Sequence, residues 1–469
     1  MEAAEHNVFS FIKYLRRARE KKPNEALQSQ AASTESFHAP APAETDPYGE
    51  RQWHSELIRL SGNNRILNEF SIERLGEKPD QNLVMLHGYG AGLGFFYKNF
   101  EGLSRLPGWK LYALDLLGMG RSSRPPFRLT SKDKQGCIRE AEDWFIDALE
   151  EWRVKKKIDR FTLMGHSLGG YMAVAYALKY PGHLNKLVLA SPVGVPEDPH
   201  AVNADLPDPS TETTLANELT QDQKEDISKS SNVQAPEKSN VGDNNNFMNA
   251  KTRREEAGQD AGNSLPPRRP LFKFFAYLWD ANISPFSLVR WSGPLGPRLV
   301  SGWTSRRFSQ LGIDEAQALH TYAYSLMRQK GSGEYALAYV LAPGAFARSP
   351  LIRRIAGVGR QIVQPDNAAT NSEVSLAQRR ESGIPIVFIY GENDWMDVAG
   401  GFASEQKLKE EKERILAKAT AEEKAKDQGS ARVLIVRNAG HHVYLDGWEE
   451  FNEVMRQEMK SVSKRSESQ

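Results

Sequence analysis

Short apolar runs alternate with helical stretches along this chain, and that alternation limits the folds it can adopt. The runs are four or five residues long, too short for buried helices, and they are residues 82–86, 110–114, 160–164, 186–190, 386–390 and 433–436. Stretches such as Glu140–Trp152 and Tyr171–Lys179 separate them. Near-continuous apolar strands are typical of a sheet covered on both faces. The pattern predicts an α/β fold with a mostly parallel sheet, helices on both faces and functional residues at the carboxyl ends of the strands.

Long polar segments interrupt the predicted core. Hydrophobic residues make up only 39% of the 469 residues. Residues 196–270 contain one aromatic residue, Phe247, and such a segment cannot bury enough apolar area to offset its ordering entropy. We therefore predict an N-terminal targeting and linker segment, a first core part, a disordered insertion, a helical cap, a polar loop and a second core part, at residues 1–50, 51–195, 196–270, 271–358, 359–382 and 383–460.

The N-terminal segment combines apolar and basic residues. The apolar stretch Val8–Leu15 is followed by basic residues at positions 16, 17, 19, 21 and 22. This pattern predicts a short basic amphipathic helix, which suits mitochondrial import or an anionic membrane surface. Glu2 and Glu5 weigh against import, because transit peptides are poor in acids. The alternative is a frayed helix without a targeting role.

Composition excludes several classes of protein. The chain has 61 Lys and Arg against 60 Asp and Glu, a net charge of +1, so nothing electrostatic favours nucleic acid as a partner. Its single cysteine excludes an internal disulfide framework and a cysteine-based zinc site. No apolar run is long enough to predict a transmembrane helix.

The segment Gly165–Gly169, with the sequence GHSLG, follows the apolar run 160–164 and precedes the helical stretch Tyr171–Lys179. It matches G-x-S-x-G in the strand–turn–helix context of a nucleophile elbow. Its outer glycines remove side chains that would clash in a sharp turn, and the helix amino terminus favours a developing negative charge. We predict Ser167 as a catalytic nucleophile; the alternative is a glycine-rich turn with an incidental serine.

A serine hydroxyl is a weak nucleophile unless a base takes its proton, and a third group must hold that base in the correct tautomer. The last apolar run leads into His441 and His442, and we predict His441, which directly follows a glycine, as the base. The preceding run leads into two acids. We predict Asp394 as the acid that orients His441, with Asp397, three residues later, as the alternative.

The oxyanion of a tetrahedral intermediate needs backbone N–H donors. Leu168, directly after the serine, supplies one donor in this arrangement. The glycine-rich loop His87–Gly92 follows the apolar run 82–86 and reaches the same sheet edge, so we predict Tyr89 as the second donor. The alternative for this loop is a flexible glycine turn. These groups need no metal and no cofactor, and we predict none.

Together these motifs resemble the α/β-hydrolase superfamily over residues 51–195 and 271–458. The segment His441–Asp446 also reads as H-x4-D, which resembles the subfamily of lysophospholipid-acyltransferase-like hydrolases that includes the co-activator of adipose triglyceride lipase. Gly293–Pro297 and Lys330–Ala336 resemble the cap of that subfamily. Within it, the chain is similar to the fungal mitochondrial cardiolipin-specific deacylase and to fungal lysophosphatidic acid acyltransferases.

The resemblance implies an α/β-hydrolase fold with a helical cap, and a serine hydrolase that removes or transfers fatty acyl chains of phospholipids. Cardiolipin deacylation is the first expectation, and acyl transfer to lysophosphatidic acid or another lysophospholipid is the alternative. A non-catalytic lipid-surface regulator of a lipase is the alternative of another class, but the co-activator lacks the serine that Ser167 provides here. If H-x4-D is an acyltransferase signature, His441 and Asp446 act together in acyl transfer. The triad pairs His441 with Asp394 instead, which leaves Asp446 as a structural or helix-capping acid.

The cap suggests the partners. Its stretch Leu271–Trp279 is unusually aromatic, which suits acyl chains or a bilayer interface, although burial against the core explains it equally well. Cations near this stretch suit phosphate head groups, with scattered surface charges as the alternative; they are Arg268, Arg269, Lys273, Arg290, Arg298, Arg306 and Arg307. We expect a phospholipid substrate and peripheral contact with a membrane surface. The resemblance places the protein on the mitochondrial inner membrane, and otherwise in the cytoplasm associated with lipid.

Overall fold

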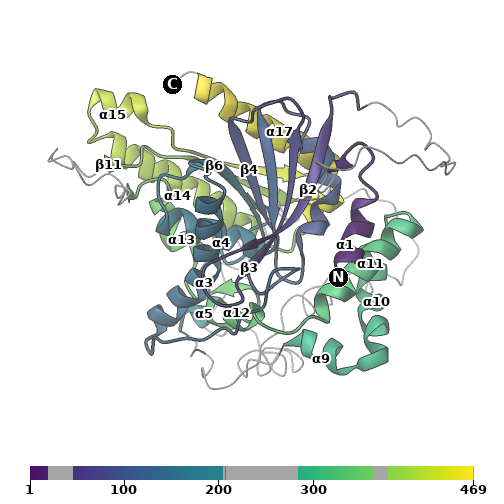
Figure 1. The fold of residues 1–469 in the computed structure, drawn as a ribbon. Coiled ribbons are helices and arrows are strands. Elements are labelled where there is room, and N and C mark those ends of the chain that lie inside the picture. The colour runs from purple at the N-terminus through teal and green to yellow at the C-terminus, as the bar shows by residue number, and fades with distance from the viewer. Residues whose placement is uncertain (19–45, 204–205, 207–283, 364–378, 468–469) are drawn as a thin grey trace, which may run out of the picture.

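The computed structural model describes residues 1–18, 46–203, 206, 284–363 and 379–467. At its centre is a nine-stranded sheet with the order β1-β2-β3-β5-β4-β6-β7-β12-β13 (Figure 1). The strands are β1 Arg16–Arg17, β2 Arg51–Arg59, β3 Ile66–Arg74, β4 Gln81–Leu86, β5 Trp109–Leu114, β6 Phe161–His166, β7 Leu184–Ala190, β12 Pro385–Gly391 and β13 Ser430–Val436. All six predicted apolar runs form strands, and the predicted mostly parallel sheet is confirmed.

Strand direction divides the sheet into two parts. From β5 to β13 the neighbouring strands run parallel, whereas β3 pairs antiparallel with both β2 and β5. The carboxyl ends of the parallel strands therefore meet at one edge, where a site is expected. β2 and β3 were not predicted, because polar and charged residues interrupt their apolar positions.

Helices cover both faces of the sheet, as predicted. On β4, Val84 and Leu86 point into one hydrophobic cluster, whereas Leu83 and Met85 point into the other. The face that bears Val84 and Leu86 is the first face, and it is covered by α3 Lys134–Lys155, α4 Leu168–Lys179 and α14 Val398–Leu416. The opposite face is covered by η1 Leu93–Phe96, α2 Tyr97–Leu103, α16 Val443–Asp446 and α17 Trp448–Glu467.

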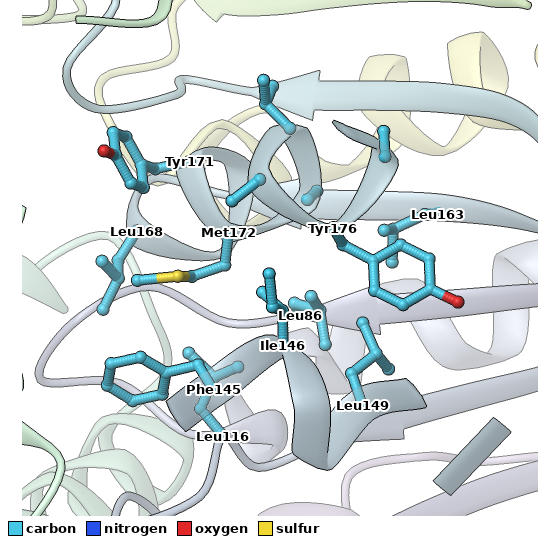
Figure 2. Close-up of a cluster of buried hydrophobic side chains, with 14 of the residues drawn as sticks. Leu86, Leu116, Phe145, Ile146, Leu149, Leu163, Leu168, Tyr171, Met172 and Tyr176 are labelled. Atoms are coloured by element: carbon cyan, nitrogen blue, oxygen red, sulfur yellow. The ribbon is translucent and has the colours of Figure 1, made fainter. Parts of the chain in front are cut away.

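The packing between α3 and α4 shows how the first face is built. Figure 2 shows Phe145 and Leu149 of α3 facing Leu168 and Met172 of α4, with Leu86 of the sheet between them. All five side chains are at most 3% exposed. Burial of this kind stabilises by about 1.5–3 kcal/mol for each large side chain, so the helix that follows Ser167 is firmly held.

A helical cap follows β7 in the chain, as predicted. Its elements are α9 Pro285–Trp291, η2 Gly293–Leu295, α10 Gly296–Arg307, α11 Ile313–Met327, α12 Glu334–Val340, β8 Leu341–Ala342, β9 Phe346–Ala347, α13 Leu351–Arg354 and η3 Ile355–Gly357. Figure 1 shows α9 and α10 at the lower edge of the molecule, beyond the strands. The aromatic stretch Leu271–Trp279 lies outside the described residues. No helix in the described part of the chain is long and apolar enough to span a bilayer.

The N-terminal residues correct one prediction. The helix observed is α1 Glu2–Phe9, and residues 1–18 do not form a separate basic amphipathic helix. Val8 and Phe9 are 0% and 3% exposed. The Phe9 ring lies 4.4 Å from that of Phe70 and 5.5 Å from that of Trp53. Apolar side chains that suggested a membrane-binding face are buried in the domain instead.

Two segments predicted as irregular contain ordered elements at their ends. Pro199–Asn203 forms the short helix α5, although the insertion was predicted to begin at residue 196. Lys134 fixes this helix by donating from Nζ to the Val202 carbonyl at 2.7 Å. In the predicted loop 359–382, β10 Ile362–Val363 pairs antiparallel with β11 Arg379–Arg380. Residues 204–205, 207–270 and 364–378 of these segments lie outside the described residues. One further helix, α15 Ala421–Lys426, lies between α14 and β13.

Candidate functional site

Ser167 occupies a strained turn between β6 and α4. Its backbone angles are φ 50° and ψ −114°, in a region that a side-chain-bearing residue adopts only when its surroundings enforce it. A Cβ on Gly165 would lie 2.2 Å from the Gly169 carbonyl oxygen, and one on Gly169 would lie 2.5 Å from that of Leu86. Both glycines are therefore required by close backbone contact, and the turn has the geometry of a nucleophile elbow.

His441 and Asp394 form a buried pair at the same edge of the sheet. Asp394 follows β12, His441 follows β13, and Nδ1 of the imidazole lies 3.2 Å from Oδ1 of the carboxylate. Asp394 is 7% exposed and His441 6%. Among the described residues, Nε2 of His441 has no hydrogen-bond partner, although it is buried. A carboxylate that accepts from Nδ1–H leaves Nε2 as the acceptor that a general base needs.

His166 connects the elbow to the His441 loop. Its Nε2 donates to the His441 backbone carbonyl at 2.9 Å, and the two rings are 4.7 Å apart. Burial, with His441 nearby, lowers the pKa of His166 well below its usual value, so the ring is neutral. The residue directly before Ser167 thus holds the residue predicted as its base. Sequence reasoning missed His166, because it occupies a variable position of the motif.

The other two candidate acids have different partners. Asp397 caps the amino terminus of α14 and accepts from the Ala399 N–H at 3.1 Å. Asp446 accepts from the Gly440 N–H at 3.1 Å through Oδ2, and its Oδ1 pairs with Nη1 of Arg307 in the cap at 2.9 Å. Asp394 is therefore the carboxylate placed against the His441 ring. Asp446 holds the backbone beside His441 and ties that loop to the cap.

The loop predicted to hold an oxyanion lies directly against the elbow. A Cβ on Gly88 would lie 3.1 Å from Cβ of Ser167. The buried ring of His87 shapes this loop: Nδ1 donates to the Gly88 carbonyl at 2.7 Å, and Nε2 accepts from the Leu116 N–H at 3.0 Å. Within the described residues, the Leu168 N–H donates no hydrogen bond, so it is available beside Ser167.

A buried polar cluster beneath this loop was not predicted. Asp115 accepts from the backbone N–H groups of Leu93 at 2.8 Å and Arg121 at 2.7 Å. Asn68 bridges Asp115 to Glu5 of α1, which also accepts from Arg121 at 2.7 Å. Burial, followed by repulsion from Asp115, raises the pKa of Glu5 to about 7. The N-terminal helix therefore supports the loops beside Ser167, which no local sequence signal indicates.

The groups gathered here fit nucleophilic acyl substitution. A serine on an elbow, an imidazole with an available Nε2, a carboxylate on Nδ1 and a backbone N–H beside the serine are the parts that this chemistry uses. Among the described residues, no group of three or more His, Cys, Asp or Glu side chains is placed to hold a metal ion.

Comparison with known proteins agrees with this fold. The family model of the alpha/beta hydrolase fold matches residues 81–447. The chain is 31% identical over 357 residues to a 1-acylglycerol-3-phosphate O-acyltransferase of Arabidopsis thaliana, covering 74% of this chain and 63% of the plant protein. It is 27% identical over 408 residues to the 1-acylglycerol-3-phosphate O-acyltransferase ABHD5 of Mus musculus, covering 86% of this chain and 84% of that protein.

A third relative carries the name of a lipase. The chain is 27% identical over 402 residues to the (lyso)-N-acylphosphatidylethanolamine lipase of Homo sapiens, covering 84% of this chain and 85% of that protein. The names of all three relatives describe acyl groups of lipids. The match spans well over half of the chain and contains the elbow and the His441–Asp394 pair. This chain belongs to the alpha/beta hydrolase fold family.

Proposed function

We propose that this chain is a serine enzyme that removes or transfers fatty acyl groups of glycerophospholipids. One observation carries the proposal: the His441–Asp394 pair, 3.2 Å apart, is hydrogen-bonded through His166 to the elbow that bears Ser167. Ser167 is the nucleophile, His441 the base and Asp394 the group that orients the imidazole. A scaffold that only regulates a lipase has no need for this strained serine.

The reaction has two halves. Oγ of Ser167 attacks the ester carbonyl while Nε2 of His441 takes its proton, and the oxyanion accepts from the Leu168 and Tyr89 N–H groups. The tetrahedral intermediate collapses, and His441 returns the proton to the departing lysolipid oxygen. Water or a lysolipid hydroxyl then attacks the acyl-enzyme, giving its proton to His441, which passes it to Ser167. Water releases a fatty acid, whereas a lysolipid hydroxyl yields a newly acylated lipid.

The substrate class rests on the relatives and on the resemblance. Two relatives are named for acylation of 1-acylglycerol 3-phosphate, and a third for hydrolysis of an N-acylated phospholipid. These names support an acyl ester of a glycerophospholipid, including lysophosphatidic acid as acceptor. The resemblance to the fungal cardiolipin-specific deacylase supports cardiolipin as a further candidate substrate.

A membrane surface is the proposed source of these lipids. Leu288, Trp291, Leu295 and Leu299 in the segment from α9 to α10 are 51%, 71%, 58% and 55% exposed. These exposed apolar side chains, with the exposed Arg298 directly before Leu299 in the sequence, suit insertion between anionic head groups. Phe286 of α9 stacks on Tyr89 of the oxyanion loop at 5.4 Å, so this part of the cap contacts the loop beside the site.

The experiment is a lipid panel with mass-spectrometric readout. The full chain and Ser167→Ala are incubated with cardiolipin, phosphatidic acid and N-acylphosphatidylethanolamine, with and without lysophosphatidic acid as acceptor. We expect acyl release or transfer by the parent, none by the variant, and equal melting temperatures. Equal activity of the two proteins contradicts the nucleophile, and no activity of either favours the non-catalytic regulator.

Location on the mitochondrial inner membrane is proposed on the resemblance to the fungal mitochondrial enzyme. Because residues 1–18 pack into the fold, deletion of the N-terminus damages the domain and cannot test targeting by itself. Replacing Lys13 and Arg17 by serine in a fluorescent fusion keeps Val8 and Phe9 in place. We expect a reduced mitochondrial signal, and an unchanged one contradicts a basic targeting signal at these positions.

A further inference from the structure

A small pocket adjoins the oxyanion loop on the side of the cap. The space in it is about 350 Å³ when its opening to solvent is included. Its walls are Tyr89–Ala91 of the oxyanion loop, Gly118–Gly120 of the loop after β5, and Phe286 and Leu326 of the cap. Ser167 does not line this pocket, but Gly88, the residue before Tyr89, packs against it, so the pocket and the proposed nucleophile lie on either side of the oxyanion loop.

Arg124 is a half-buried cation in the wall of this pocket. Its Nη1 donates to the Ser122 carbonyl at 3.0 Å and its Nη2 to the Gly120 carbonyl at 2.8 Å. A guanidinium has five N–H donors, so three remain after these two bonds. In the part of the chain that the structure describes, no carboxylate forms an ion pair with Arg124. Burial lowers the pKa of Arg124, and Asp115 and Glu334 oppose that effect only in part.

The other charged residues of the pocket compensate Arg124 only in part. Glu334 lines the pocket, but its Oε1 accepts from Nη2 of Arg290 at 2.6 Å. Lys330 also lines the pocket, is exposed, and forms no ion pair with another described residue. The pocket therefore has two cations that form no ion pair with a described carboxylate, and Asp115 and Glu334 offset the charge of Arg124 only in part. A poorly compensated cation beside an active site is costly unless an anionic ligand pairs with it.

We propose that Arg124, assisted by Lys330, binds the phosphate of the substrate's glycerophosphate head group in this pocket, an inference that rests on the proposed acyl-ester activity. Planar guanidinium donors match phosphate oxygens, and Arg124 is already held in place by two backbone carbonyls. Phe286 and Leu326 provide an apolar wall for the glycerol carbons and the start of the acyl chain. A phosphate bound there places the ester beside the Tyr89 loop.

The test compares two esters that differ only in the phosphate. A short-chain monoacylglycerol and its 3-phosphate, both below their micelle concentrations, are hydrolysed by the full chain, Arg124→Gln, Arg124→Lys and Arg128→Gln. Arg128 is the matched control, since it is an exposed arginine four residues along the same loop. We expect Arg124→Gln to lower the ratio of kcat/KM values, phosphate ester over neutral ester, by about tenfold to a hundredfold. Arg124→Lys retains part of the preference, and Arg128→Gln retains all of it.

A second readout separates binding from loop damage. We expect glycerol 3-phosphate to compete with the neutral ester for the parent enzyme, and glycerol and acetate not to compete. Arg124→Gln should raise the inhibition constant of glycerol 3-phosphate at least about tenfold. An equal loss of kcat/KM on both esters in Arg124→Gln, with an unchanged inhibition constant for glycerol 3-phosphate, overturns the proposal, because Arg124 then only supports the loop. Inhibition by acetate as strong as by glycerol 3-phosphate also overturns it, since the pocket then takes a fatty acid carboxylate.

Failure of the proposed function gives a different result. If neither ester is turned over, the acyl-ester activity fails. Binding of glycerol 3-phosphate to the Ser167→Ala protein, measured by calorimetry with and without Arg124→Gln, still reports on the pocket. Binding that disappears with Arg124→Gln supports the phosphate site, and binding that persists unchanged overturns it.

Discussion

The side chain of His166 donates from Nε2 to the backbone carbonyl of His441 across 2.9 Å, so the elbow and the loop of the proposed base are joined by a buried hydrogen bond. The bond links β6 to the loop after β13, two segments that are 275 residues apart. Its effect is to fix the backbone of His441 relative to Ser167, while Asp394 fixes the ring. Misplacement of a reacting group by about 1 Å costs about a hundredfold in rate.

This bond predicts a specific pattern among His166 variants. His166→Phe keeps a ring but removes the donor and leaves the His441 carbonyl buried without a partner. We expect kcat to fall by about tenfold or more with little change in KM. His166→Gln offers an amide N–H close to the former Nε2 and keeps most of kcat. Steady-state kinetics on one soluble ester measure both variants, and equal kcat values for the two contradict a role for the donor.

The two candidate acids are separated by stability and activity. Asp394→Asn keeps the size of the side chain but removes the carboxylate charge that stabilises the His441 imidazolium and its tautomer, so kcat falls by about 10³–10⁴-fold. Asp397→Ala removes the cap of α14, which costs about 1 kcal/mol in the free energy of unfolding and leaves kcat nearly unchanged. Kinetics and urea unfolding of both variants check this. The reverse pattern makes Asp397 the orienting acid.

Glu5 makes the stability of the domain depend on pH. Burial raises its pKa from 4.5 to about 7, so the folded state holds this proton more tightly than the unfolded state. Its contribution is fully favourable below pH 4.5 and is lost as pH rises through about 7, a change of about 3 kcal/mol. Glutamine is always neutral, so we expect the unfolding free energy of Glu5→Gln to rise relative to that of the parent as the pH increases from 4.5 to about 7.

Urea unfolding between pH 4.5 and 8 measures the Glu5 effect. The control is Glu2→Gln, which changes an exposed acid of the same helix that also pairs with Arg121, at 3.1 Å. The difference in unfolding free energy between Glu5→Gln and the parent should grow with pH, while that of Glu2→Gln stays nearly constant. A constant difference for both variants contradicts the raised pKa of Glu5.

The exposed apolar side chains of the cap, which include Leu295 and Leu299, predict binding to anionic vesicles. Replacing Leu295 and Leu299 together by glutamate removes two insertion points and adds two charges that anionic lipids repel, so the vesicle affinity falls by at least about tenfold. Leu57→Glu is the control, because Leu57 is 53% exposed but lies on β2 in the sheet. Sedimentation with vesicles of phosphatidylcholine and phosphatidylglycerol measures binding. Equal loss in the control contradicts docking through the cap.

Much of the central sheet was predictable because its strands are buried on both faces and are read as continuous apolar runs. The catalytic candidates follow directly from these strands, so their shared edge was predictable as well. β2 and β3 were missed since strands near the sheet margin alternate polar and apolar residues. Pairing of His441 with Asp394 rather than Asp397 depends on the turn after β12, which sequence spacing does not determine.

The role of the N-terminus was not predictable from local patterns. Val8 and Phe9 belong to an apolar stretch that suggests a surface helix, and only the three-dimensional structure shows that both are buried and that Phe9 packs against Trp53 and Phe70. Glu5 was interpreted as an argument against an import signal, whereas it is buried beside Asp115 and Arg121. Contacts between residues so distant in sequence leave no periodic signal.

The most direct measurement is covalent labelling with a fluorophosphonate, followed by mass spectrometry of the modified peptide. The account predicts one adduct, on Ser167, at a rate that falls by at least about a thousandfold in His441→Ala, with no adduct in Ser167→Ala. Labelling of a different residue, or an equal rate in His441→Ala, would contradict the claim that His441 activates the serine of this elbow.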